Sequence, residues 1–541
     1  MITRRKTLAL TLALLCGGGF TSGQNAGTSS ASAAVGPYRI AGVLVNAANG
    51  EPVRRGMVQA LDDSSHADAS CVTDNDGRFA LEHLAAAKYQ LSASKRGFRV
   101  QAYNQHDEFA TSIVTGPDQD TTHLEFKLMP NAVLYGTITD DDGEPVANAR
   151  VLLFKRPRFS GTGERTMQAD ATMTDDTGAY EFGNVAAGEY LLAVTAEPWY
   201  AVHGSAAAKR NSALDVAYPV TYFDSTTDER SATPVELAGG MREEANMSLH
   251  AVPALHLSVS APHKDDGSIS VPQLQQVAFG VLIDGQSATE IGGLGTGMME
   301  VNGLAPGHYE LSQGDPPRVA DLELSSNQQV DAESGRQENA LAGRVRMVSG
   351  APVPEQLTVS LERMDNGPGQ NQYATEARQG QFRFDSITPG EYAVWANAAD
   401  KSMHVIGVGA GSRVQGGNLI TVRDRSPELV VVASEGETRV EGFAKKDRKG
   451  FAGAMMVLLP KNTAQWKALT RRDQSDSDGS FAFRDVVPGG YTAIAIEDGW
   501  PLDWTSPAVM ARYLPSGTNV TVTVNSGKLV RLPSPVTVQQ R

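Results

Sequence analysis

Three acidic segments of the chain carry the residue types that bind calcium. They are "DNDG" (74–77), "TDDDGE" (139–144) and "DQSDSDG" (473–479). Ca²⁺ takes about six to eight oxygen ligands, and closely spaced carboxylates supply them. None of the three segments has the spacing of an EF-hand loop, however, and Asp followed by Gly is also the chemistry of a β-hairpin turn. Hairpin turns are therefore the prediction, and Ca²⁺ is the one cofactor kept as an alternative.

A second candidate for chemistry is a cluster of aromatic residues near the C-terminus. Trp500 and Trp504 lie in "EDGWPLDWTSPAVMARY", which ends at Tyr513. Sugar rings stack on aromatic faces, so these three residues are the predicted ligand-binding residues. Exposure of Trp500, Trp504 or Trp199 together would indicate a glycan site. Tryptophans in a short segment after a strand more often close the end of a β-sandwich. The cluster therefore has two interpretations, a sugar-binding face and a hydrophobic plug.

Motifs for catalysis are absent from the sequence. The ten histidines are scattered, and none lies in the His-Glu-x-x-His arrangement that binds zinc. No Gly-x-Ser-x-Gly segment provides a hydrolase nucleophile, and Cys71 has no local partner. The glycine-rich segment "GVGAGSRVQGG" (407–417) lacks the Gly-Lys-Ser/Thr ending of a phosphate-binding loop. The sequence predicts no catalytic residues, no metal ligands and no enzyme activity.

One pattern of residues occurs five times in the chain. Its centre is a tyrosine, found at Tyr89, Tyr190, Tyr309, Tyr392 and Tyr491. A glycine stands two residues before four of them, at Gly188, Gly307, Gly390 and Gly489, with Ala87 in the first copy. A second glycine stands twelve residues before each tyrosine, at Gly77, Gly178, Gly297, Gly380 and Gly479. A catalytic loop is rarely needed five times, so the pattern predicts architecture.

The repeated pattern is typical of a β-hairpin that ends in a tyrosine corner. Large residues ten and eight positions before each tyrosine share one face of an extended strand, as do the tyrosine and its second neighbour downstream. In three copies the turn between the strands is "APG" (305–307), "TPG" (388–390) or "VPG" (487–489). Pro fixes φ there, and Gly is free to take a positive φ. In a tyrosine corner, the hydroxyl group bonds to nearby backbone in a Greek-key sandwich.

A second repeated segment, made of a strand, a glycine-containing turn and Pro-Val, precedes the hairpin. It occurs in "IAGVLVNAANGEPV" (40–53), "LYGTITDDDGEPV" (134–146) and "LAGRVRMVSGAPV" (341–353). Successive tyrosines are 83 to 119 residues apart, close to the size of a small β-sandwich. The sequence thus predicts an all-β chain, a tandem array of about five Greek-key β-sandwich modules, with one short helix over 506–514. The expected modules are 37–130, 131–252, 253–339 (divergent), 340–437 and 438–541.

The two repeated segments resemble the carboxypeptidase regulatory-like domain, a transthyretin-like (prealbumin-like) β-sandwich. The resemblance rests on Gly-Glu-Pro-Val at 50–53 and 143–146 and on the hairpins in which Asp-x-x-Gly leads to Gly-x-Tyr. It is weaker in the third module, which lacks the acidic turn. The segment "VTYFDSTTDERSATPVELAGG" (220–240) also resembles one found beside such domains in large bacterial envelope proteins.

This resemblance implies a carbohydrate-binding-like sandwich fold and a place in the bacterial cell envelope. It does not imply peptidase activity, because in carboxypeptidases this domain is the non-catalytic companion. Related sandwiches in starch-binding domains bind sugars, which is why glycan binding is kept as an alternative function.

The N-terminus has the pattern of a secretory signal peptide. Basic residues at 4–6 precede an apolar segment at 8–16 that is too short to span a bilayer. We expect a signal peptide over 1–23 and a disordered Ser/Ala/Gly-rich leader over 24–36. Lipidation of Cys16 is an alternative, although a leucine precedes it where a small residue is expected. The protein is therefore predicted to be exported, to the periplasm, the outer membrane or the medium, without a transmembrane segment in the mature chain.

The mature chain is strongly acidic. The whole chain has 47 Lys and Arg against 62 Asp and Glu, and loss of the three basic residues of the signal peptide leaves 44 − 62 = −18. This charge argues against nucleic acid as a partner. Only Cys71 remains after cleavage, so hydrophobic cores must stabilise the modules. The sequence favours a non-catalytic exported scaffold or interaction protein whose partners are other envelope proteins, with a glycan-binding protein as the alternative.

Overall fold

The computed structural model describes residues 36–541 except 63–66, 157–165, 204–210, 261–270, 288, 291–297, 315–316, 332–335, 338, 366–371, 400–402, 412, 424–425 and 524–527. The predicted signal peptide, Cys16 and the leader up to residue 35 lie outside the described residues, as does Gly297 of the third repeat. Within the described residues, every helix is too short or too polar to cross a membrane.

The described chain is almost entirely β-structure, which confirms the predicted fold class. Its strands form five groups, which we call modules 1 to 5. Module 1 contains β1 (Tyr38–Asn46), β2 (Met57–Leu61), β3 (Ala67–Val72), β4 (Arg78–Leu84), β5 (Lys88–Ser94), β6 (Gln101–Ala102), β7 (Ile113–Val114) and β8 (Leu124–Leu128). Module 2 contains β9 (Ala132–Thr139), β10 (Arg150–Lys155), β11 (Met167–Met173), β12 (Ala179–Val185), β13 (Gly188–Thr195), β14 (Val216–Ala217), β15 (Thr221–Tyr222), the 3-10 helix η1 (Glu229–Ser231), β16 (Val235–Leu237), β17 (Arg242–Glu244), β18 (Met247–Ser248) and β19 (Val252–Pro253).

The remaining three modules have the same plan. Module 3 contains β20 (Leu255–Ser260), β21 (Gln273–Ala278), β22 (Val281–Ser287), β23 (Thr289–Glu290), β24 (Met298–Leu304), β25 (Gly307–Gly314), β26 (Pro317–Leu324), β27 (Gln328–Val330) and β28 (Arg336–Gln337). Module 4 contains β29 (Asn339–Met347), β30 (Leu357–Arg363), β31 (Gln372–Ala377), β32 (Gln381–Ile387), β33 (Gly390–Ala398), β34 (Met403–Ala410), β35 (Arg413–Gly416), β36 (Leu419–Val422) and β37 (Leu429–Glu435). Module 5 contains β38 (Arg439–Lys446), β39 (Lys449–Gly450), β40 (Met455–Pro460), η2 (Thr463–Gln465), α1 (Trp466–Leu469), β41 (Arg471–Gln474), β42 (Ser480–Phe483), β43 (Gly489–Glu497), α2 (Pro507–Met510), η3 (Leu514–Ser516), β44 (Thr518–Val522), β45 (Leu529–Arg531) and β46 (Val536–Gln540).

One strand order recurs in all five modules. The first strand of each module pairs antiparallel with the first strand of the repeated hairpin and parallel with a strand near the end of the module, as in β4-β1-β8 and β32-β29-β37. The second strand has antiparallel neighbours on both sides, as in β3-β2-β5 and β31-β30-β33. Apolar side chains that alternate along these strands meet in one hydrophobic core per module.

Module 5 departs from two separate layers. Its last strand, β46, pairs parallel with β38 and also parallel with β43, which belongs to the other layer. The two layers are thereby joined into one folded sheet of nine strands. Module 5 also has a second hydrophobic core on the outer side of β40 and β43, covered by α2 and η3.

All five repeated tyrosines are buried and make the same hydrogen bond. Each hydroxyl group donates to the carbonyl oxygen four residues earlier in the chain. The donor–acceptor distances are 3.4 Å for Tyr89, 3.1 Å for Tyr190, 2.9 Å for Tyr309, 2.7 Å for Tyr392 and 2.8 Å for Tyr491. This is the geometry of a tyrosine corner, which ties the turn of each hairpin to the start of its second strand.

The glycines before these tyrosines have a different role from the one expected. Gly307 is nearly extended, with a φ of 158°, and neither Gly390 nor Gly489 has a positive φ, so the Pro-Gly turns need no left-handed residue. A Cβ at Gly489 would instead lie 3.2 Å from the ring of Tyr491. The tyrosine ring folds back over the residue two positions earlier, and a small residue leaves room for it. The hairpin glycines twelve positions upstream do take left-handed φ values, 73° at Gly77, 74° at Gly178, 79° at Gly380 and 84° at Gly479.

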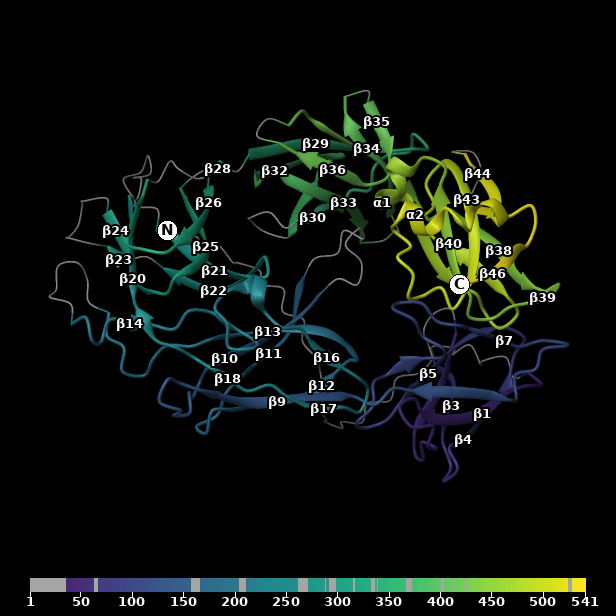
Figure 1. Ribbon diagram of the computed structural model, residues 1–541. Coiled ribbons are helices and arrows are strands. Elements are labelled where there is room, and N and C mark those ends of the chain that lie inside the picture. The colour runs from purple at the N-terminus through teal and green to yellow at the C-terminus, as the bar shows by residue number, and fades with distance from the viewer. Residues whose placement is uncertain are drawn as a thin grey trace, which may run out of the picture.

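The modules follow one another around a ring (Figure 1). Module 2 leads from module 1 along the bottom of the view to module 3 at the left, and module 4 leads across the top to module 5 at the right. There the yellow strands of module 5 lie directly against the purple and blue strands of module 1. Hydrogen bonds between residues 363 and 364 positions apart join these two modules. The first and last modules of the described chain therefore contact each other.

Candidate interaction site between modules 1 and 5

The predicted aromatic residues of module 5 are covered rather than open to solvent. Trp500 is 4% exposed and Tyr513 is 2% exposed, and both belong to the second core of this module. Trp504 is partly buried against the same core, and Trp199 lies in module 2, so the rings are not exposed together. The expectation of a sugar-binding face at Trp500 and Tyr513 is therefore corrected, because a buried ring offers no face to a ligand in solution.

The face of Trp500 is occupied by side chains of module 1. The imidazole of His106 stacks on the indole with ring centroids 4.8 Å apart and an angle of 3° between the planes. The ring of Phe109 lies 5.9 Å from the same indole at an angle of 29°. The aromatic cluster chosen from the sequence thus does bind planar groups, but the groups come from the first module of the same chain.

The acidic segment "DQSDSDG", one of the calcium candidates, also binds module 1. The carboxylate of Asp476 accepts a hydrogen bond from the backbone nitrogen of Ser112 (2.9 Å) and forms an ion pair with Lys88. The backbone nitrogen of Ser477 donates to the carbonyl oxygen of Ser112 (2.9 Å), and its hydroxyl oxygen accepts from the backbone nitrogen of Val114 (2.8 Å). The segment therefore pairs with the backbone around β7 much as a short strand would.

The side chain of Gln474 is buried, and module 1 satisfies its polar atoms. Its amide nitrogen donates to the carbonyl oxygen of Asn104 and to the hydroxyl oxygen of Thr111, both at 2.7 Å. Its amide oxygen lies 3.0 Å from Nδ1 of His106. A buried amide costs free energy unless it is hydrogen-bonded, so Gln474 stabilises the contact and specifies its register.

Arg472 is the cation of module 5 at this contact. Its guanidinium group forms ion pairs with Asp107 (3.1 Å) and Glu108 (3.3 Å) of module 1. The same group lies 5.0 Å from the ring centroid of Phe109 and 4.5 Å from that of Trp504. Arg472 therefore joins an aromatic ring of each module while it neutralises two carboxylates.

At the pair of Lys88 and Asp476, burial and the charge of the partner shift the pKa of each group in opposite directions. Burial alone would lower the pKa of Lys88, but the carboxylates of Asp476, Asp478 and Asp473 hold its pKa above the ordinary value. Burial raises the pKa of Asp476, and Lys88 offsets this only in part. The lysine, whose side chain is 41% exposed, keeps its charge readily, whereas the buried aspartate depends on its partners in module 1.

In the other two acidic segments, the first aspartate is bonded within its own turn. The carboxylate of Asp74 accepts from the backbone nitrogens of Asp76 (2.9 Å) and Arg78 (2.8 Å), and that of Asp140 accepts from Asp142 (3.0 Å) and Glu144 (2.9 Å). Local bonds of this kind define an ordinary turn. Among the described residues, no group of three or more His, Cys, Asp or Glu side chains is placed to hold a metal ion.

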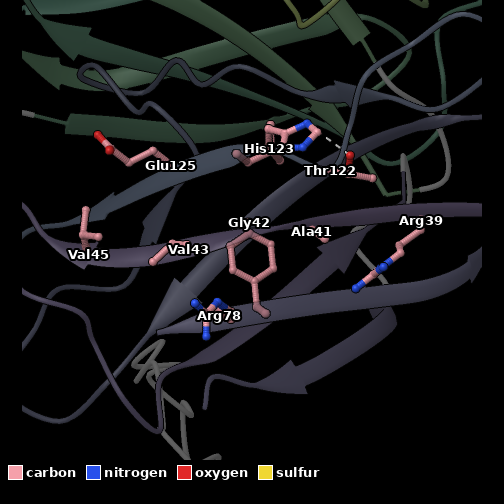
Figure 2. A pocket seen from close by; sticks show the side chains of 11 residues that line it. Arg39, Ala41, Gly42, Val43, Val45, Arg78, Thr122, His123 and Glu125 are labelled. Carbon is pink, nitrogen blue, oxygen red and sulfur yellow. Dashed lines mark hydrogen bonds between the residues drawn. The ribbon is translucent and has the colours of Figure 1, made fainter. Parts of the chain in front are cut away.

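A hollow on the outer face of β1, β4 and β8 is a second surface feature of module 1 (Figure 2). Its volume is about 590 Å³. Four charged or titratable side chains line it, and each has an ion-pair partner: Arg39 with Glu82, Arg78 with Asp76, His123 with Asp120, and Glu125 with Lys127. These side chains are largely exposed, so the hollow lacks the buried polar group that would position a ligand.

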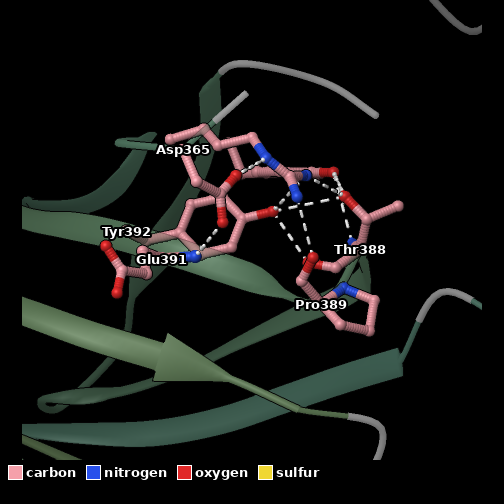
Figure 3. Close-up of polar contacts among 7 residues, drawn as sticks. Asp365, Thr388, Pro389, Glu391 and Tyr392 are labelled. Carbon is pink, nitrogen blue, oxygen red and sulfur yellow. Dashed lines mark hydrogen bonds and ion pairs between the residues drawn. The ribbon is translucent and has the colours of Figure 1, made fainter. Parts of the chain in front are cut away.

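The tyrosine corner of module 4 contains a buried arginine, Arg363, and its partners are labelled in Figure 3. Arg363 donates to the hydroxyl oxygen of Tyr392 (3.1 Å), the hydroxyl oxygen of Thr388 (2.7 Å) and the carbonyl oxygen of Pro389 (2.8 Å), and pairs with Asp365 (2.6 Å). These bonds engage the guanidinium group of Arg363 and the carboxylate of Asp365 together. It therefore stabilises one turn and is not a binding site.

Two other junctions between modules are also held by histidine and aspartate. At the junction of modules 2 and 3, Asp215 bonds to His203 (3.0 Å) and to His256 (2.9 Å). Burial would raise the pKa of Asp215, but these two bonds hold it below the ordinary value. At the junction of modules 4 and 5, His404 pairs with Asp485, and this contact raises the pKa of His404.

The module 1 half of this site was not identified from the sequence. The segment 103–112 supplies His106, Phe109 and Thr111, yet its letters are those of an ordinary polar loop. No local spacing relates it to residues more than 360 positions away. A matching of charges, the acids at 107–108 against the basic Arg472, is the one signal that could have indicated it.

Comparison with known proteins agrees with the sequence-based resemblance. The model of the carboxypeptidase regulatory-like domain matches residues 39–129 and 133–218. No curated protein matches the chain in sequence.

Several solved structures are similar to parts of the chain. The Bacillus anthracis TIE protein is 9% identical, over 90% of this chain and 68% of its own, with a TM-score of 0.17. A Streptococcal ancillary pilin is 12% identical, over 55% of this chain and 100% of its own, with a TM-score of 0.19. The RrgB pilus protein of Streptococcus pneumoniae is 10% identical, over 76% of this chain and 99% of its own, with a TM-score of 0.16. Likenesses at these scores carry no argument about function. The family match covers module 1 and most of module 2, so these two parts of the chain are similar to the carboxypeptidase regulatory-like domain.

Proposed function

We propose that the protein is a non-catalytic, exported scaffold whose five β-sandwich modules are held as a closed frame. This proposal rests on the role of the two parts of the chain that the sequence marks as most able to bind a ligand. The acidic segment at 473–479 and the indole of Trp500 both serve to join the last module to the first. A string of small domains on short connections would bend at each junction, whereas a closed frame keeps the outer faces of its modules at fixed positions.

The outer faces offer places for protein partners. Met57 and Val72 lie opposite each other on β2 and β3 and are exposed. Met167 and Met173 are exposed at the two ends of β11, which is the edge strand of its sheet. Exposed apolar side chains on an unpaired strand edge favour association with other proteins. The expected partners are proteins of the cell envelope.

Photo-crosslinking in the native envelope tests this function. A photoreactive residue at Val72 or Met167 is expected to give defined adducts with other envelope proteins. The same residue at Asp142, which is exposed in a polar turn, serves as the matched control and should give none. Absence of adducts at both apolar positions would count against a scaffold. Turnover of peptide, ester or glycoside substrates by purified residues 24–541 would count against a non-catalytic role.

Glycan binding remains the second candidate because of one observation in module 2. Trp199 is 87% exposed, and the ring of Tyr200 lies 5.7 Å from its indole. Two adjacent rings at the surface suit a sugar, with an expected Kd on the order of millimolar to micromolar. A glycan array of residues 24–541, repeated with Trp199→Ala, separates the two functions. Binding that disappears in the variant while its melting temperature is unchanged would favour the glycan-binding protein.

A further inference from the structure

The contact between modules 1 and 5 joins two different surfaces. Module 1 contributes Lys88 and the segment 104–114, and module 5 contributes the segment 472–480 and Trp500. A contact between unlike surfaces is heterologous, so a surface on one copy is complementary to the other surface on any further copy. The chain that connects the two modules holds them close but supplies no atom to the hydrogen bonds described above.

We propose that module 5 binds module 1 of a second copy through this same surface, giving a dimer in which both contacts are exchanged between the chains. The inference deepens the proposed scaffold function and rests on it, because exchange turns a closed frame into a unit of assembly. The occupant of each surface is a second copy of this chain. No new surface is required, since every contact of the exchanged dimer already exists within one chain.

The charges of the contact favour one partner and one orientation. Module 5 places acids opposite Lys88 and a cation opposite two acids, since Asp476 pairs with Lys88 and Arg472 pairs with Asp107 and Glu108. A partner must therefore present a cation and an acidic pair at matching positions, which module 1 does. Charge patterns with both signs suppress other partners and fix the register.

The backbone contributes to the same selectivity. The main-chain nitrogen of Ser477 donates to the carbonyl oxygen of Ser112, and the hydroxyl oxygen of Ser477 accepts from the main-chain nitrogen of Val114. Gln474 fits between Asn104, Thr111 and His106. These bonds require the local backbone of module 1, so an unrelated acidic or aromatic surface does not replace it.

Closure within one chain and exchange between chains compete through concentration. A flexible link gives two tethered surfaces an effective concentration on the order of millimolar, which favours the closed monomer in dilute solution. Blocking closure within one chain removes this advantage. The exchanged dimer should therefore be revealed by variants that cannot close on themselves but can close on each other.

Charge reversal at Lys88 and Asp476 produces such a pair of variants. In Lys88→Glu two carboxylates face each other within one chain, and in Asp476→Lys two ammonium groups do. In a mixed dimer, the new carboxylate of the first chain meets the new ammonium group of the second. The unchanged Asp476 of the first chain meets the unchanged Lys88 of the second. Both contacts of the mixed dimer are thus complementary, while both monomers are repulsive.

Light scattering after size exclusion measures the result on residues 24–541. Each variant alone is expected to have the mass of one chain. An equimolar mixture of the two variants should have the mass of two chains when it is measured at about tenfold higher concentration than a trace sample. Circular dichroism checks that both variants fold. Folded variants whose mixture keeps the mass of one chain would overturn the proposal. The scaffold function would survive that outcome, because its own test reads adducts with other proteins.

Cysteine pairing decides the question if charge reversal unfolds module 5. In a Cys71→Ser background, one chain carries Ser112→Cys and the other carries Ser477→Cys, and the two are refolded together from urea. Exchange predicts a disulfide-linked dimer on a non-reducing gel. The control replaces Ser477→Cys by Asp176→Cys, at the same position of the equivalent turn in module 2, and should give no dimer. Absence of a linked dimer above this control would overturn the proposal.

Discussion

The hairpin turns at 175–178 in module 2 and at 476–479 in module 5 have the same backbone and opposite roles. In module 2 the backbone nitrogen of Asp175 donates to Ala179 (3.0 Å), and in module 5 that of Asp476 donates to Ser480 (2.8 Å). The glycine of each turn has a left-handed φ, 74° at Gly178 and 84° at Gly479. The carboxylate of Asp175 accepts hydrogen bonds from its own turn, whereas that of Asp476 accepts from module 1. One turn is thus a closed unit and the other a docking site.

The two turns also differ in the residue two positions after the aspartate. In module 2 the side chain and backbone of Thr177 both donate to Asp175, and so does the backbone nitrogen of Ala179. In module 5 the corresponding residue is Asp478, whose carboxylate accepts the backbone nitrogen of Ser480 (2.8 Å). From its own turn Asp476 accepts the hydroxyl group of Ser480 (3.3 Å), and its other partners, Ser112 and Lys88, belong to module 1. Module 1 also has a carboxylate at this position, Asp76, and Asp74 there still accepts from its own turn, so the contact with module 1 and not the residue type alone directs Asp476 outward.

The pKa directions follow the same division. Hydrogen bonds from Thr177 and Ala179 lower the pKa of Asp175, which is exposed. Burial raises the pKa of Asp476. Hydrogen bonds within a turn stabilise the ionised form of a carboxylate. Burial in a docking contact destabilises the ionised form, and the partners of the carboxylate must offset that cost.

Removal of the docking carboxylate should have the largest effect. In Asp476→Ala, Lys88 and the backbone nitrogen of Ser112 lose their acceptor. Loss of one partner of such a pair costs about 2 kcal/mol, at the low end of the usual range because Lys88 is partly exposed, which is roughly a 30-fold shift toward the open frame. Energy transfer between dyes on modules 1 and 5 measures it.

Asp175→Ala is the matched control for that experiment. Its carboxylate contacts only its own turn among the described residues, so the distance between modules 1 and 5 should not change. An equal loss of energy transfer in both variants would contradict the distinction between the two turns.

Placing the residue of module 2 in the docking turn should give Asp476 a competing donor within its own turn. In Asp478→Thr, the nitrogen of Ser480 loses its acceptor and the new hydroxyl group can donate to Asp476, as Thr177 does to Asp175. Asp476 would then be shared, and docking should weaken by about 1 kcal/mol, the value of one hydrogen bond. Asp478→Asn keeps an acceptor oxygen and should retain most of the docking. The dye pair used for Asp476→Ala compares the two variants.

The stability of module 5 should depend on pH through Asp473. Burial raises the pKa of Asp473 from 3.8 to about 6, against hydrogen bonds from the backbone nitrogens of Ala482 and Gln474; Asp476 adds to the rise and Lys88 opposes it. The folded state then binds more protons than the unfolded state between pH ~4 and ~6, so the free energy of unfolding falls as pH rises through this window.

Asp473→Asn tests the assignment of this pH dependence. The amide carries no charge at any pH and keeps an oxygen for Ala482, so the slope between pH ~4 and ~6 should flatten and the melting temperature at pH 7 should rise by about 2–4 °C. Thermal melts of residues 24–541 across this range measure both. A slope identical to that of the parent chain would show that another group is responsible.

The conservative change Arg472→Lys should have the smallest effect. Lysine keeps the charge opposite Asp107 and Glu108 but loses the planar group that lies over Phe109 and Trp504. A loss of about 0.5 kcal/mol is expected, the value of a partly exposed cation–π contact. Titration with denaturant, followed by the dye pair, measures it. An effect as large as that of Asp476→Ala would mean that the aromatic contacts, not the acidic turn, dominate docking.

The sequence predicted the architecture well because each module contains the same local pattern of residues. The five tyrosines and the hairpin glycines act within a few residues of themselves, so their spacing alone indicates a turn, a strand and a buried face. The role of the Pro-Gly glycines was misjudged because the crowding ring of Tyr491 acts through space and leaves no mark on turn statistics.

The docking site was only half predictable. Asp476 and Trp500 were candidates for ligand contact because carboxylates and indoles bind ligands. Both do lie in a contact surface, but they contact module 1 of the same chain. The occupant, the segment around His106 and Ser112, is brought there by the path of three intervening modules. Contacts between residues more than 360 positions apart depend on the geometry of every junction, and no local pattern contains that information.

The closure of the frame is the central claim, and one measurement tests it directly. In a Cys71→Ser background, Ser112→Cys and Ser477→Cys are placed in the same chain and oxidised at nanomolar concentration, where chains rarely meet. We predict a disulfide within the chain, seen as faster migration on a non-reducing gel and reversed by reductant, because the two backbones are hydrogen-bonded at 2.9 Å. Free thiols that persist in a folded double variant, at the rate found for the pair Ser112→Cys and Asp176→Cys, would contradict it.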